Sequence, residues 1–87
     1  MPFYSESYLY NLGLRRFGRN VNISDKCSIY NPQNIIIGDN VRIDDFCILS
    51  AGKEIVIGNF VHIACYTSLI GRGAIIIKDF VVSFVVH

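Results

Sequence analysis

The sequence predicts an all-β fold, a triangular solenoid of about four stacked coils, because apolar residues recur along it every 20 positions. Three columns of this repeat contain only apolar residues: Phe17, Ile37, Ile57 and Ile77; Val21, Val41, Val61 and Val81; Ile35, Ile55 and Ile75. Self-similarity at a fixed period of this length is typical of solenoids, in which each repeat buries its apolar face against the next one.

A finer period of six residues divides each repeat into three short strands. Ile37, Ile43 and Leu49 lie six residues apart, and each follows an apolar or small residue by two positions. A spacing of two places both side chains of such a pair on the same side of a strand. The inner positions lack helical spacing and are mostly β-branched, which argues against helices. Stretches that contain Gly, Pro or Asn, such as residues 50–54, are expected to form one enlarged corner in each coil.

The residues before the first coil do not repeat and are expected to form a short helical or irregular cap over residues 1–14. Ser5 or Ser7 could cap a helix there, with Leu9 and Leu12 on one face and Gly13 near its end. Residues 15–87 are then the coils. The pattern decays after Phe80, and we interpret residues 83–87 as part of a truncated or altered C-terminus that leaves the coils incomplete.

The hexads that carry a family resemblance are clearest in IIIGDNVRIDDFCIL (residues 35–49) and IVIGNFVHIACYTSL (residues 55–69). They resemble the hexapeptide-repeat acyltransferases, and the likeness covers about residues 15–81. Parallel crossovers are nearly always right-handed, but the resemblance implies a left-handed parallel β-helix. Residues 35–69 are most similar to bacterial sugar O-acetyltransferases of polysaccharide pathways.

This resemblance implies transfer of an acetyl group from acetyl-CoA to a hydroxyl or amine, with a His as general base. In the sugar-acetylating branch that His follows a coil such as residues 55–69, inside the corner loop. Residues 70–74 of this chain contain no His. The catalytic residue therefore stays unassigned, and we expect the chain alone not to acetylate.

The chain contains two histidines, and neither fits the loop position. His62 alternates with the inward Val61 and Ile63, so it is expected to point outward, either as an exposed or interface residue or as a catalytic base. His87 falls in the column of Cys27, Cys47 and Thr67, at the terminus. Related β-helix carbonic anhydrases hold zinc with three His. This chain has only two, so no metal site is predicted.

The three cysteines, Cys27, Cys47 and Cys65, have spacings that match no metal-binding pattern. We expect small buried or corner thiols that stay reduced, because side chains one strand apart are badly aimed for a disulfide. The net charge of +1, with no basic cluster, argues against binding to nucleic acid or anionic membranes. No signal peptide or apolar stretch of transmembrane length is present, which predicts a cytoplasmic protein.

The outward residues Ile36, Val56 and Ile76 form an apolar stripe, and aromatic pairs are expected to stack at two corners: Phe60 with Phe80, and Phe46 with Tyr66. Such residues also favour strands and turns for local reasons. The alternative is subunit contact, and the resemblance implies a trimer with active sites between subunits. Two functions stay open: the N-terminal part of an acetyl-CoA-dependent sugar O-acetyltransferase, or a non-catalytic β-solenoid for structure or assembly.

Overall fold

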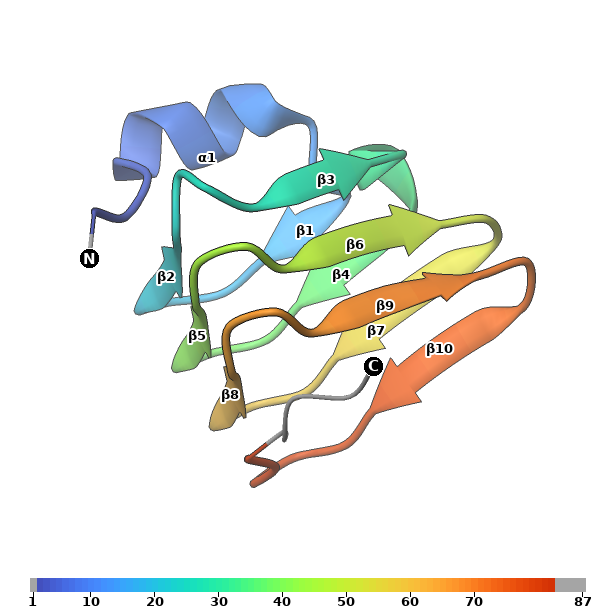
Figure 1. Cartoon of the computed structure of the whole chain (residues 1–87). Coiled ribbons are helices and arrows are strands. Elements are labelled where there is room, and N and C mark those ends of the chain that lie inside the picture. Colours follow the sequence, from blue (N-terminus) through green and yellow to red (C-terminus); the bar gives the residue numbers. More distant parts are fainter. Residues whose placement is uncertain (1, 83–87) are drawn as a thin grey trace.

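The chain winds around three parallel β-sheets, which form the three faces of a solenoid (Figure 1). The computed structural model describes residues 2–82. The first face consists of β1 (Arg16–Phe17), β4 (Ile35–Ile37), β7 (Glu54–Ile57) and β10 (Ala74–Ile77). The second face consists of β2 (Val21–Ile23), β5 (Val41–Ile43) and β8 (Val61–Ile63). The third face consists of β3 (Ser28–Tyr30), β6 (Ile48–Ala51) and β9 (Ser68–Gly71).

The predicted all-β parallel solenoid with a short N-terminal helix is confirmed. Residues 2–82 form three complete coils, and β10 begins a fourth. Beyond β10, these residues add only an isolated bridge between His62 and Val82. The predicted number of about four coils is therefore slightly too high for this part of the chain. The decay of the repeat at residues 83–87 lies outside the described residues.

Neighbouring strands pair with a register of 20 residues on all three faces, so equivalent side chains lie directly above one another. Along β4, Ile35 and Ile37 are almost completely buried, whereas Ile36 between them is partly exposed. This alternation confirms the predicted inward pairs. The fully buried members are Ile23, Ile35, Ile37, Val41, Ile43, Cys47, Leu49, Ile55, Ile57, Val61 and Ile63. Burial of an Ile or Leu side chain contributes about 1.5–3 kcal/mol relative to exposure, so this core is the main source of stability.

The corner between the first and second faces is held by a ladder of Asp and Asn side chains. The backbone N–H of Asp39 donates to Asn59 Oδ1 at 2.7 Å, and the N–H of Asn59 donates to Asp79 Oδ1 at 2.7 Å. The residues before Asp39 and Asn59, Gly38 and Gly58, are glycines for a steric reason. A β-carbon on Gly38 would lie 2.5 Å from Asn59 Oδ1 and 2.7 Å from the carbonyl oxygen of Gly58.

Helix α1 (Glu6–Leu12) lies across the N-terminal end of the solenoid (Figure 1). Of the two predicted caps, Ser5 is the one used, because its hydroxyl accepts a hydrogen bond from the N–H of Tyr8 at 3.2 Å. Gly13 ends the helix in the left-handed conformation, with φ of 95°. Leu9 is buried against the core. The division of the chain into a cap and coils at residue 14 stays a prediction.

The three cysteines are free thiols, as predicted. Cys27 Sγ donates to the carbonyl oxygen of Asp44, and Cys47 Sγ donates to that of Ala64, both at 3.0 Å. The same contact thus recurs one coil later. Burial raises the pKa of Cys27 to about 12, and burial also raises the pKa of Cys47. Both thiols therefore serve packing and stay protonated at neutral pH.

Candidate functional site

A cluster of charged side chains lies on the outer surface of the second face. His62 is in the middle of β8, next to Arg42 in the middle of β5, because these strands pair in register. Asp44 follows β5 directly and lies between the two: its Oδ2 is 2.8 Å from His62 Nε2, and its Oδ1 accepts from Arg42 Nε at 2.7 Å. The second face therefore carries a carboxylate between an imidazole and a guanidinium.

The carboxylate is the buried member of this cluster. The side chain of Asp44 is 11% exposed, whereas those of His62 and Arg42 are 39% and 50% exposed. Burial by itself raises the pKa of Asp44, but the hydrogen bonds from His62 and Arg42 and their charges outweigh it, so the pKa is lowered. An ionised Asp44 orients the imidazole of His62.

Sequence reasoning found His62 but missed its partners. The predicted outward direction of His62 agrees with its partial exposure between the buried Val61 and Ile63. Arg42 could have been found, because it stands 20 residues before His62 in the same column. No comparable sequence pattern indicated that Asp44 would contact His62. A catalytic role for His62 stays a hypothesis, and His87 lies outside the described residues.

Two aromatic stacks confirm the predicted corner pairs. Phe46 and Tyr66 stack with ring centroids 5.3 Å apart, and Phe60 and Phe80 stack at 5.2 Å. All four have positive φ between 56° and 64°, a conformation that bulky residues rarely adopt. The apolar stripe on the first face is also present, with Ile36 and Val56 partly exposed and Ile76 63% exposed. No group of three or more His, Cys, Asp or Glu in residues 2–82 could hold a metal ion.

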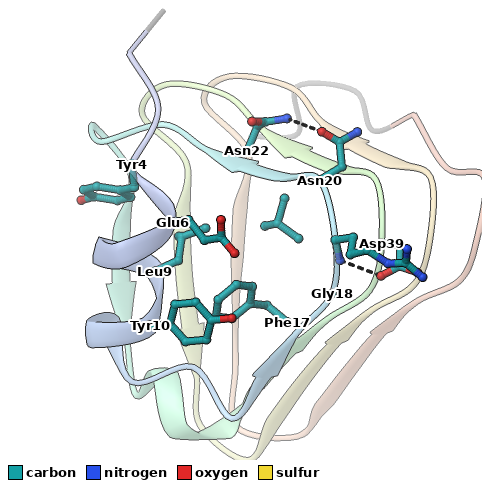
Figure 2. A pocket seen from close by; sticks show the side chains of 11 residues that line it. Tyr4, Glu6, Leu9, Tyr10, Phe17, Gly18, Asn20, Asn22 and Asp39 are labelled. Atoms are coloured by element: carbon teal, nitrogen blue, oxygen red, sulfur yellow. Dashed lines mark hydrogen bonds between the residues drawn. The ribbon is translucent and has the colours of Figure 1, made fainter.

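A pocket of about 680 Å³, which we call the mouth pocket, opens at the N-terminal end of the solenoid between α1 and the first coil (Figure 2). Its lining includes Glu6, Leu9, Tyr10, Phe17, Asn20 and Asn22. Figure 2 shows Glu6 and Leu9 pointing from α1 toward the opening, with Tyr10 beside Phe17. The sequence could not predict this pocket, because the position of α1 relative to the first coil is set by packing.

A three-sided parallel solenoid with hexad periodicity defines the hexapeptide-repeat class of proteins. No protein-family model matches the chain, and no curated protein matches it. Solved structures do match it. AntD, an N-acyltransferase from Bacillus cereus in complex with dTDP-4-amino-4,6-dideoxyglucose and coenzyme A, is 52% identical over 92% of this chain, with a TM-score of 0.86. AntD in complex with dTDP and 3-hydroxybutyryl-CoA gives the same values.

Another AntD structure with the same amino sugar and coenzyme A is 35% identical, with a TM-score of 0.68, and the match covers 92% of this chain and 66% of that one. With the repeat and the parallel solenoid, these matches show that the chain belongs to the hexapeptide-repeat acyltransferase family. The chain spans 42% of the length of the first AntD structures named above. In the part of the chain that the structure describes, no helix is long and apolar enough to cross a membrane.

Proposed function

We propose that this chain is the N-terminal part of an acyltransferase that moves an acyl group from acyl-CoA to a sugar nucleotide. The observation that carries this proposal is the similarity to AntD, at 52% identity and a TM-score of 0.86 over 92% of the chain. AntD structures contain coenzyme A or 3-hydroxybutyryl-CoA together with dTDP or a dTDP-sugar. A CoA thioester as co-substrate and a sugar as acceptor follow by analogy.

The acceptor atom is the point at which this proposal differs from the sequence-based expectation. The hexads resemble those of sugar O-acetyltransferases, which acylate a hydroxyl, whereas AntD is an N-acyltransferase. An amino sugar acceptor is therefore the better supported choice. O-Acetylation, the acetyl group itself and a place in polysaccharide synthesis stay predictions.

His62 is the residue of this chain best suited to take up a proton from such an acceptor, because Asp44 orients its imidazole at 2.8 Å. The trimer suggested by the family resemblance would bring further residues to the second face. We place the subunit contact on the stripe of Ile36, Val56 and Ile76, whose exposed apolar atoms need a partner. A cytoplasmic location stays a prediction.

Turnover of acyl-CoA, measured by release of the free thiol, tests the proposal. The chain replaces the matching segment of AntD in a chimera, and acetyl-CoA and 3-hydroxybutyryl-CoA are supplied with dTDP-4-amino-4,6-dideoxyglucose. We expect turnover by the chimera and none by the 87-residue chain alone. A folded, oligomeric chimera without turnover would instead favour a non-catalytic solenoid module.

The same assay separates the roles of the histidine and of the acceptor atom. Loss of a general base removes about 10²–10⁴ of the rate, so His62→Ala in the chimera shows whether His62 has this role. A dTDP-sugar with a hydroxyl in place of the amine tests O-acylation. Turnover by the chain alone would show that the expectation of inactivity is wrong.

A further inference from the structure

The mouth pocket combines an apolar floor with a polar rim. Val21 and Leu9 are buried beneath it, and Phe17 is partly buried. Helix α1 covers one side of the opening and leaves the other side uncovered (Figure 2). A volume of about 680 Å³ lies within the range of small-molecule sites, roughly 300–1,000 Å³. The space is large enough for one or two sugar rings.

The charge at the rim favours a cation. The Glu6 carboxylate has no hydrogen bond or ion pair with another group among residues 2–82, and it points over the opening (Figure 2). Asp39 is the second carboxylate of the lining, and its Oδ1 accepts the N–H of Arg19 at 2.8 Å. The two carboxylates outnumber the single guanidinium of Arg19, so an anionic ligand would meet repulsion.

An aromatic surface lines the same pocket as the Glu6 carboxylate. Tyr10 packs edge to face against Phe17 with ring centroids 5.0 Å apart, and Tyr10 is 70% exposed. A cation gains from the face of such a ring, and the apolar side of a sugar ring can pack on it as well. A carboxylate and an exposed aromatic ring that line one pocket make a suitable site for an ammonium group.

Two amides complete the rim with hydrogen-bonding groups. Asn20 Nδ2 donates to Asn40 Oδ1 at 2.9 Å, and Asn22 Nδ2 donates to Asn20 Oδ1 at 3.4 Å. This order leaves the side-chain oxygen of Asn22 at the end of the chain of bonds, as an acceptor for a ligand hydroxyl. Because these amides and Glu6 line the opening, a purely apolar ligand would leave polar groups without partners.

We propose that the mouth pocket binds a small hydroxylated amine of the amino-sugar class, with its ammonium group at Glu6, its ring against Tyr10 and a hydroxyl at Asn22. The proposal concerns binding alone and does not depend on acyl transfer. An N-acylated sugar carries no positive charge, so the pocket distinguishes an amine from its amide.

Titration of the 87-residue chain with three probes, followed by amide chemical shifts in NMR, tests the proposal. The probes are glucosamine, glucose and N-acetylglucosamine, at slightly acid pH where the amine is protonated. Exposed ion pairs contribute up to about 1 kcal/mol, so we expect glucosamine to bind about fivefold more tightly than the other two. The shifts should concentrate in α1 and around Phe17.

Two variants and one control locate the effect. Glu6→Gln should remove the preference for glucosamine while leaving the fold unchanged, because Glu6 is an exposed residue of α1. Tyr10→Ala should weaken binding of all three sugars about threefold. Asn11→Ala, on α1 but outside the pocket lining, should change nothing. No binding, equal binding of the three probes, or a preference that survives Glu6→Gln would overturn the proposal, whatever the acyltransferase assay shows.

Discussion

The first and second faces of the solenoid have similar inward residues, whereas their outer surfaces differ in polarity. Most inward residues of both are aliphatic and buried, such as Ile37 on β4 and Ile43 on β5. The outer surface of the first face carries the apolar stripe, whereas that of the second carries Arg42 and His62. Packing therefore constrains the inward columns, and the outward columns are left for contacts with other molecules.

Stacking in register gathers the outward side chains of each face into one column, with Arg16 next to the stripe on the first face and Asn22 next to Arg42 on the second. Residues 20 positions apart lie one strand apart, so their side chains form continuous columns. A column of Ile and Val exposes contiguous apolar area, whereas Arg42 and His62 both contact an anionic side chain. Asp44 supplies that anion on the second face. Four changes test this difference between interior, corner and outer surfaces.

The largest effect is expected for a charge in the shared interior. Ile43 has no exposed surface, so Ile43→Asp would bury a carboxylate without a partner and cost several kcal/mol, more than about 4. We expect insoluble protein or loss of the β signal in circular dichroism. Ile36→Asp, on the outer surface of the first face, is the matched control and should keep the fold. An unchanged melting curve for Ile43→Asp would show that the inward assignment is wrong.

A methyl group at the corner that joins the two faces should have the next largest effect. In Gly38→Ala the new β-carbon would lie 2.5 Å from Asn59 Oδ1 and 2.8 Å from the carbonyl carbon of Gly58. Relief of such overlap costs about 1–3 kcal/mol, measurable by urea denaturation. Gly73→Ala is the control, because no heavy atom lies within 4 Å of its β-carbon site. Equal stability of the two variants would contradict the close stacking of this corner.

A charge on the apolar stripe should change assembly and leave the fold intact. Val56 lies in the middle of the stripe, between Ile36 and Ile76. Sedimentation of the unmutated chain should show a species larger than the monomer, and Val56→Glu should shift it toward the monomer. Ser68→Glu, at an exposed position on the third face, should leave association unchanged. Finding the unmutated chain monomeric at high concentration would rule out this contact.

The smallest effect is expected on the second face. The pKa of Asp44 is lowered in the folded chain. The pairing of Asp44 therefore stabilises the fold at pH values above the ordinary Asp pKa of about 3.9. This stabilisation is lost as the pH falls through the lowered pKa of the folded chain. Asp44→Asn should reduce the free energy of unfolding by about 1 kcal/mol at neutral pH, since its partners are exposed. The difference should shrink in urea titrations at strongly acid pH. A difference independent of pH would assign the loss to packing instead.

The interior of the fold was predictable and the charged cluster only in part. The period of 20 places Ile35, Ile55 and Ile75 in one column, and parallel pairing in that register follows directly. The pairing of Arg42 with His62 follows from the same register. Asp44 could not be assigned, because its position after β5 depends on the turn that redirects the chain.

The mouth pocket could not be predicted from the sequence, for a related reason. Residues 2–14 do not repeat, so no column relates Glu6 or Tyr10 to the first coil. The choice of Ser5 over Ser7 as the cap had the same origin: the structure places Ser5 directly before α1 and Ser7 inside it. Local propensity indicates a helix there, but it does not determine the direction in which that helix lies.

The sequence by itself determined the solenoid, its inward and outward columns and the place of His62 on an outer surface. These follow from periodicity, because successive side chains of a strand point to opposite faces and equivalent positions of successive repeats stack on one another. Only the tertiary structure decided that Asp44 reaches His62 and that Glu6 points over an open pocket. It also decided that the Asn59 side chain and the Gly58 backbone exclude a β-carbon at Gly38. Such contacts join non-equivalent positions of the repeat, or a non-repeating segment to it, and their geometry is set by packing in three dimensions.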